Sequence, residues 1–160
     1  MSKNDTQMTF EELLARDGYL VYTNVGTSML PLLRQGRDLL EIRRKDAARC
    51  RKYDAVLYKT GGRYILHRIL QVRERDYVIV GDHCFRKEYG ITDGQILGVL
   101  TGIVRGGKHI STSDRLYRCY VHLWCDFYPV RAGLLYCGEL FRRAKAKLRR
   151  LIGAPKNSRS

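Results

Sequence analysis

The sequence predicts a mainly β fold with a short N-terminal helix and a basic helical hairpin at the C-terminus. Short runs rich in valine, isoleucine, leucine and tyrosine recur through the first two thirds of the chain, as β-strands require. From Ser111 the apolar residues recur instead at helical spacing. The expected strands of this antiparallel sheet structure cover residues 19–25, 38–43, 53–59, 63–73, 76–81 and 96–105.

The N-terminal helix is predicted by a capping box. Thr9 and Glu12 have the spacing at which each side chain satisfies the other residue's free backbone donor, and Leu13 and Leu14 follow. The helix should end near Gly18, because glycine commonly terminates helices.

Turn signals divide the strand region. Gly61-Gly62 lies between Val56-Leu57-Tyr58 and Tyr64-Ile65-Leu66, which is a strong signal for a β-hairpin. Further turns are expected at residues 73–76 and at Gly106-Gly107.

The C-terminal region should form two helices separated near Pro129, because proline interrupts a helix. The first has Leu116, Tyr120, Leu123 and Phe127 at helical spacing. A chain of 160 residues is long enough for one domain with a real core. We therefore expect a helix at 1–18, a β domain at 19–110 and a basic amphipathic tail at 111–160.

The chain is strongly basic, with 30 Lys and Arg against 16 Asp and Glu and a net charge of +14. Nine of the basic residues lie from Arg131 onward, together with one acidic residue, Glu139. The tail could be a solvated helix face, or it could contact an anionic membrane peripherally. In the second case Trp124, Phe127, Tyr128 and the leucines of the tail would insert, and the headgroups would meet Arg142, Arg143, Lys145, Lys147, Arg149 and Arg150. Nucleic acid ranks third as a partner, since no base-reading motif accompanies the charge.

Several classes of protein do not fit the composition. The five cysteines are odd in number and form no C-x-x-C pair, so neither a disulfide framework nor a zinc site is expected, and reduced thiols fit a cytoplasmic protein. The N-terminus lacks the apolar core of a signal peptide. The longest charge-free run, residues 18–33, is too short and too polar to span a membrane, so no transmembrane helix is expected.

Residues 26–31 read Gly-Thr-Ser-Met-Leu-Pro and place Ser28 in a predicted turn. Serine is common in turns, where its hydroxyl bonds nearby backbone. The alternative is a nucleophile, which needs a base to take its proton.

His67 is the strongest candidate for that base. It alternates with Ile65 and Ile69 on one strand face, where an imidazole is either a core residue or a functional one. Asp82, directly after the strand at 76–81, could hold the imidazole or simply form a turn. His83 with Cys84 makes only a weak metal site, and no metal or cofactor is expected. The residues thus suggest Ser28, His67 and Asp82 as nucleophile, base and orienting acid, with their geometry left open.

Five boxes in chain order carry a resemblance to a known superfamily. They are G-T-S-M-L-P-L-L-R-Q-G-R-D, K-Y-D-A-V-L-Y, I-L-H-R-I-L, Y-V-I-V-G-D-H and I-L-G-V-L-T-G-I. Over residues 10–105 the chain resembles the signal peptidase I and SOS-repressor self-cleavage superfamily of serine endopeptidases. Because it has histidine rather than lysine at position 67, the chain resembles the Ser-His branch of this superfamily, which is found in the endoplasmic reticulum and in sporulation.

The resemblance implies roles for individual residues. Ser28 matches the nucleophile and its backbone N–H an oxyanion donor, His67 matches the base, and Asp82 matches the supporting carboxylate. Asp93 is a candidate for a second acidic position of that branch. The implied fold is the coiled antiparallel sheet of signal peptidases.

The implied activity is a serine endopeptidase that cleaves a peptide or a leader or signal-like sequence through an acyl-enzyme, without a cofactor. The transmembrane anchor of signal peptidases is not expected here, nor the DNA-binding helix-turn-helix that precedes the catalytic domain of repressors. We expect a cytoplasmic location, with peripheral contact at the inner face of the membrane as an option. The alternatives are a non-catalytic peptide-binding module and a basic protein that acts at anionic membrane surfaces.

Overall fold

The computed structural model describes residues 8–23 and 25–152 and contains one antiparallel sheet with helices at both ends. This confirms the predicted mainly β class and the helices on either side of it. The elements in chain order are α1 (Phe10–Asp17), β1 (Tyr19–Thr23), β2 (Asp38–Arg44), β3 (Ala55–Thr60), β4 (Arg63–Val72), β5 (Tyr77–Val80), β6 (Glu88–Ile91), the 3-10 helix η1 (Asp93–Gln95), β7 (Ile96–Arg105), β8 (Lys108–Ser111), α2 (Arg115–Asp126) and α3 (Tyr128–Ile152).

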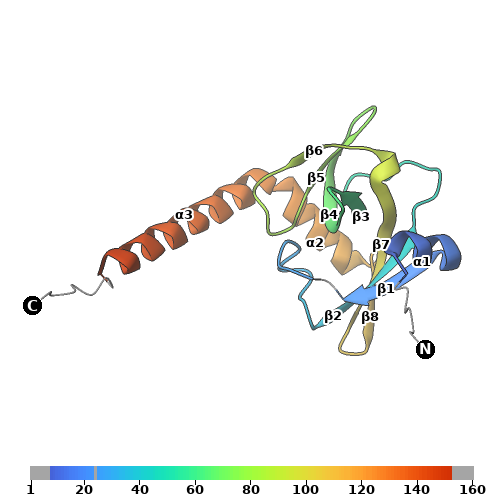
Figure 1. The fold of residues 1–160 in the computed structure, drawn as a ribbon, viewed down its shortest axis with the longest axis horizontal. Coiled ribbons are helices and arrows are strands. Elements are labelled where there is room, and N and C mark those ends of the chain that lie inside the picture. Colours follow the sequence, from blue (N-terminus) through green and yellow to red (C-terminus); the bar gives the residue numbers. More distant parts are fainter. Residues whose placement is uncertain (1–7, 24, 153–160) are drawn as a thin grey trace, which may run out of the picture.

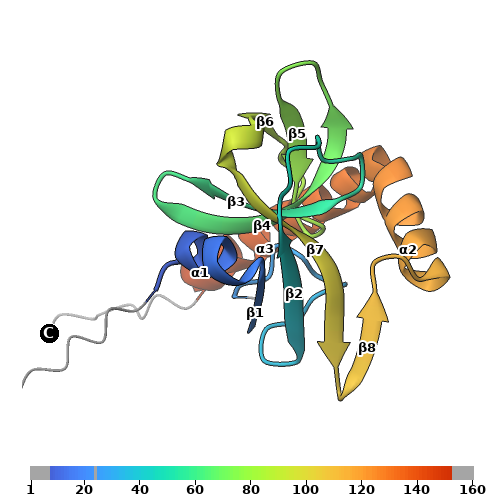
Figure 2. The ribbon, with the colours of Figure 1, turned by 90° about the vertical axis from the view of Figure 1, so that its right-hand side faces the viewer.

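The strands follow the order β1-β2-β7-β3-β4-β5-β6, with β8 also paired to β7. The long strand β7 therefore pairs with β2, β3 and β8 at different points along its length. The pairing register shifts at Glu41/Ile42, Leu57/Tyr58 and Ile69/Gln71, and such irregularities increase the local twist of a sheet. Figure 2 shows the strongly coiled sheet that results.

The two strongest local signals form as predicted. In the capping box the Glu12 N–H lies 3.3 Å from Thr9 Oγ1, and the Thr9 N–H lies 2.7 Å from Glu12 Oε2. Gly18, at φ 76°, ends α1. The hairpin of β3 and β4 turns at Gly61-Gly62, both at positive φ, and pairs Val56 with His67. Two short strands, β6 and β8, were not predicted.

Two apolar clusters hold the sheet together, and α2 belongs to the larger one. Tyr117, Val121 and Cys125 of α2 are buried in that cluster with residues of β2, β3 and β7. The first part of the predicted tail is therefore packed into the β domain. The predicted second helix, α3, runs outward from the body of the molecule (Figure 1). Among the described residues, no helix combines the length and apolarity needed to cross a membrane.

Candidate active site

The backbone carbonyl of the predicted serine and the imidazole of the predicted histidine both approach Gly81, which directly follows β5. A Cβ atom added to Gly81 would lie 2.7 Å from the Ser28 carbonyl oxygen and 2.9 Å from His67 Nε2. The Ser28 carbonyl oxygen and His67 Nε2 are therefore separated by no more than the sum of these two distances. Only glycine leaves room for so close an approach of two other chain segments. The local sequence Val-Gly-Asp thus brings together two residues that are 39 positions apart.

Ser28 lies in a turn that its neighbours hold in place. Met29 and Leu33 are fully buried, and the Leu33 N–H donates to the Met29 carbonyl at 2.9 Å. The His83 N–H donates to the Ser28 carbonyl at 2.7 Å, which ties this turn to the segment after β5. Within the described residues, neither the Ser28 hydroxyl nor its N–H makes a hydrogen bond. Ser28 is therefore held through its carbonyl and its buried neighbours, not through its hydroxyl.

His67 is held by a carboxylate from β6. Its side chain lies on β4, is 7% exposed, and places Nδ1 2.7 Å from Glu88 Oε1. Tyr58 donates its hydroxyl to Glu88 Oε2 at 2.7 Å and lies 3.3 Å from His67 Nδ1. A carboxylate at Nδ1 favours the proton on that nitrogen. The lone pair then belongs to Nε2, the atom next to Gly81 and Ser28.

Burial lowers the pKa of His67 below its ordinary value, because an apolar environment disfavours the imidazolium. The negative charges of Glu88 and, to a lesser degree, Asp82 oppose this shift without reversing it. At neutral pH the imidazole is therefore neutral and can accept a proton. This is the protonation state that a general base requires.

Asp82 does not contact His67, so its predicted role as the orienting acid needs correction. Its carboxylate receives two hydrogen bonds from Arg68, Nε to Oδ1 at 2.9 Å and Nη2 to Oδ2 at 2.8 Å. Both side chains are completely buried. Tyr120 donates a further bond to Oδ2 at 3.2 Å. The carboxylate that hydrogen-bonds His67 is instead that of Glu88.

The sequence contained one usable sign of this arrangement. Arg68 interrupts the apolar run 65–70, and alternation points it to the face opposite His67, where a buried guanidinium needs a carboxylate. Glu88 had no comparable signal. It reaches His67 because β6 pairs with β5, opposite Ile79, and the sequence of β6 carries no strand pattern.

Asp93 bonds residues other than His67. It accepts a hydrogen bond from Tyr77 at 2.6 Å and forms ion pairs with Lys45 and Arg49, each at 3.1 Å. These bonds fasten η1 to the segment after β2. Asp93 is therefore a tether between two loops, and the structure does not bring it to the predicted site.

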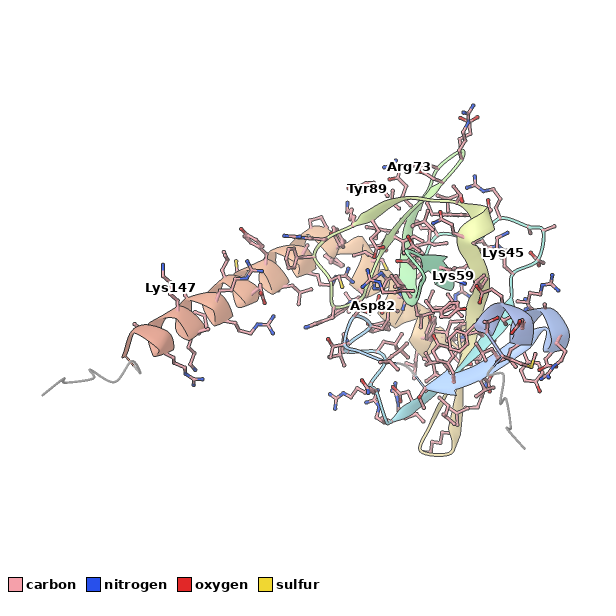
Figure 3. All side chains as sticks on the ribbon, in the orientation of Figure 1. Lys45, Lys59, Arg73, Asp82, Tyr89 and Lys147 are labelled. Carbon is pink, nitrogen blue, oxygen red and sulfur yellow. The ribbon has the colours of Figure 1, made fainter. Side chains whose placement is uncertain are left out.

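Helices α2 and α3 hold the segment that follows β5. Trp124 donates its indole N–H to the Asp82 carbonyl at 2.8 Å, and Tyr128 donates its hydroxyl to the Phe85 carbonyl at 2.8 Å. Tyr117 accepts a bond from Arg68 Nη1 at 3.1 Å. Figure 3 labels Asp82 in the interior, where the sheet and α2 meet. The position of Gly81 is thus fixed from the helical side as well as from the sheet.

Cys84 is a second nucleophilic side chain at the same point. Its Sγ lies 2.8 Å from the Cβ position constructed at Gly81, as close as Ser28 and His67. Burial raises the pKa of Cys84, and Glu88 adds to the effect while Arg131 opposes it. The group is therefore a thiol, not the reactive thiolate, at neutral pH.

An open groove of about 590 Å³ adjoins the Ser28 turn. Its walls come from the residues after Ser28, from His83 and from the junction of α2 and α3. The lining residues are Leu30, Pro31, Arg34, His83, Leu123, Trp124, Phe127, Val130, Arg131, Leu134 and Leu135. The walls are mainly apolar, as in sites that bind ligands through side-chain burial.

The described part of the chain contains no cluster of three or more His, Cys, Asp or Glu that could hold a metal ion. His109 and His122 lie on the surface, where they face Glu41 and Asp126. Comparison with known proteins found no matching family model, curated protein or solved structure.

Proposed function

We propose that this protein is a serine endopeptidase of the signal-peptidase-like type that cleaves a peptide or a leader or signal-like sequence. One observation carries the proposal: His67 Nε2 and the Ser28 carbonyl converge on Gly81, while Glu88 holds Nδ1 on the other side of the ring. A buried, neutral imidazole that a carboxylate holds at Nδ1, with Nε2 near the backbone of a half-buried serine, supports nucleophilic catalysis by that serine. The five sequence boxes support the same assignment.

The mechanism assigns one role to each group. Ser28 Oγ attacks the scissile carbonyl carbon while His67 Nε2 takes the hydroxyl proton. Glu88 stabilises the imidazolium that forms, and the Ser28 N–H donates to the developing oxyanion. The imidazolium then protonates the leaving amine, and the peptide bond breaks to give an acyl-enzyme. Water, deprotonated by His67, hydrolyses the ester and restores the serine.

The test is cleavage of candidate precursor peptides, read by mass spectrometry. Ser28→Ala and His67→Ala should each abolish cleavage, and His109→Ala, a change to an exposed histidine, should leave it unchanged. Cleavage by the Ser28→Ala protein at the wild-type rate would contradict the assignment of the nucleophile. Binding of the peptides without any cleavage by the wild-type protein would favour the alternative, a non-catalytic peptide-binding module.

The thiol of Cys84 gives a second candidate nucleophile, because its Sγ approaches Gly81 as closely as His67 Nε2 does. Cys84→Ala separates the two. We expect this variant to retain cleavage, since the thiol is protonated at neutral pH. Loss of cleavage in Cys84→Ala, with retention in Ser28→Ala, would assign the reaction to cysteine.

We further propose a cytoplasmic location with peripheral contact at the inner face of an anionic membrane. Leu134, Phe141 and Leu148 are exposed apolar residues of α3, and Arg142, Arg143, Lys145, Lys147 and Arg149 share that helix. Such a helix can insert apolar side chains while its cations meet lipid headgroups.

Flotation with vesicles tests the membrane contact. The protein should float with phosphatidylglycerol vesicles but not with phosphatidylcholine vesicles. Phe141→Ser should weaken flotation, whereas Tyr89→Ser, which changes a similarly exposed aromatic residue on β6, should not. Equal flotation of the protein with both lipids would contradict the proposal. Absence of flotation with either lipid would also contradict it and would favour a solvated α3.

A further inference from the structure

Arg131, on the first turn of α3, carries a buried guanidinium without a hydrogen-bond partner. The residue is 7% exposed, and Nε, Nη1 and Nη2 are all buried and unbonded among the residues that the structure describes. Two aromatic rings lie near it, with the guanidinium carbon 5.4 Å from the Trp124 ring centroid and 5.1 Å from that of Tyr128. Aromatic faces attract a cation but offer it no oxygen or nitrogen acceptor and no negative charge.

An unpartnered buried charge is unusual, because burial removes water without supplying a replacement. Arg68 provides the comparison within the same molecule. It is more deeply buried than Arg131, and it makes four hydrogen bonds, to Asp82, Tyr53 and Tyr117. Arg131 has the same need for an anion, and residues 8–23 and 25–152 supply no hydrogen-bonding anion to it. The guanidinium is therefore suited to an anion that arrives with a ligand.

The groove that Arg131 lines has the matching character. Apolar and aromatic side chains form most of its wall, and its charged or titratable members are Arg34, His83 and Arg131. No acidic residue of the described chain lines it. A ligand with an apolar body and one negative group complements both properties.

The groove lies beside the proposed nucleophile. Leu30 and Pro31 of its wall follow Ser28 by two and three residues, and His83 of its wall donates its N–H to the Ser28 carbonyl. A peptide in reach of Ser28 thus has the groove available for the residues next to its scissile bond.

We propose that this groove is a substrate subsite for an apolar peptide segment that contains an acidic side chain, and that Arg131 pairs with its carboxylate. The inference rests on the proposed peptidase function and adds the class of substrate. The proposal includes a change of the Arg131 rotamer that carries its buried guanidinium from the Trp124 and Tyr128 rings to the bound carboxylate. Arg131 is then a residue that determines specificity, and Ser28 and His67 act on the adjoining peptide bond.

Trp124 allows a direct binding test. It is the only tryptophan in the chain and lines the groove, so its fluorescence reports occupancy. The probes are two end-blocked peptides of leucine and serine that differ only in a central glutamate or glutamine. With Ser28→Ala protein, which cannot consume the probe, the glutamate peptide should bind on the order of tenfold more tightly, as a charge-assisted bond in a sheltered site provides.

Two variants identify the residue responsible. Arg131→Met should reduce the preference for glutamate to about one, while Arg118→Met, which removes the same charge from an exposed position on α2, should preserve it. If Arg131→Met fails to fold, Arg131→Lys retains the cation and should keep a reduced preference. Equal affinity of Ser28→Ala protein for the two peptides would overturn the proposal without any variant at position 131.

The remaining outcomes are also decisive. A Trp124 response to phosphatidylglycerol vesicles, with none to the glutamate peptide, would assign the groove to lipid and overturn the peptide proposal. Because binding is measured without cleavage, an inactive wild-type protein that still prefers glutamate would contradict the peptidase function alone. Active cleavage with no preference between glutamate and glutamine peptides would contradict the subsite alone.

Discussion

Replacing Asp82 by asparagine should destabilise the fold through Arg68, not through His67. The guanidinium and the carboxylate are both completely buried and joined by two hydrogen bonds of 2.9 and 2.8 Å. Asp82→Asn keeps the size of the side chain and removes its charge, so Arg68 becomes a buried cation without a counterion. Its other partners, the Tyr53 carbonyl and the Tyr117 hydroxyl, are neutral.

Removal of one member of a buried ion pair lowers the free energy of unfolding by about 3–5 kcal/mol. Asparagine still offers one acceptor to Arg68, which places the expected loss near the lower end, about 3 kcal/mol. For a chain of this size each kcal/mol corresponds to about 2–4 °C in Tm. The midpoint should therefore fall by roughly 6–12 °C.

Thermal unfolding followed by far-UV circular dichroism measures the effect, and urea unfolding gives the free energy directly. Asp76→Asn is the matched control. It makes the same chemical change in the partly exposed pair of Arg73 and Asp76, whose closest atoms are 3.8 Å apart, and should cost less than about 1 kcal/mol. Equal stability losses in the two variants would refute the reasoning, because burial would then have no role.

Three further predictions concern the proposed chemistry. Glu88→Gln should reduce kcat for peptide cleavage by about 10²-fold or more, since the neutral amide no longer orients and stabilises the imidazolium; a circular dichroism spectrum like the wild type's is the control, and unchanged kcat would contradict the role. Gly81→Ala should reduce cleavage by about 10²-fold, because its methyl group would lie 2.7 Å from the Ser28 carbonyl and displace that turn; Gly94→Ala, where a methyl group meets open space, should be neutral, and equal activities would exclude this close approach. In a pH profile of kcat/KM, activity should fall only below pH 6.5, because protonation removes the base and burial lowers the pKa of His67 below that ordinary value. Glu88→Gln should move this acid limb to still lower pH, since the charge of Glu88 raises the pKa; a shift to higher pH would show that another group titrates.

The sequence predicted those features that depend on neighbouring residues. The capping box of Thr9 and Glu12 and the glycine pair at 61–62 are local signals, and both formed as expected. The proximity of Ser28 to His67 followed from the order of the boxes rather than from any spacing rule. Gly81 gives that proximity its physical reason, through the space that a missing side chain leaves.

Neighbouring residues could not predict that Glu88, and not Asp82, bonds His67. Glu88 reaches His67 only because β6 pairs with β5, and a four-residue strand with a glycine at position 90 has little strand propensity of its own. The resemblance implied Asp82 as the supporting carboxylate. In the structure Arg68, which points to the strand face opposite His67, donates a hydrogen bond to each oxygen of Asp82. Pairing between distant segments decides which acid serves the histidine.

The contacts of α2 with the sheet have a consequence for the way the protein opens. Tyr117, Tyr120 and Trp124 bond the buried pair and the segment after β5, so α2 cannot unfold while the sheet remains intact. Amide protons of α2 should then exchange with solvent only through global unfolding, together with those of β4 and β5. The outer turns of α3 lack such contacts among the described residues and should exchange by local fraying. The boundary of the cooperative unit therefore falls near the junction of α2 and α3, not at the end of the last strand.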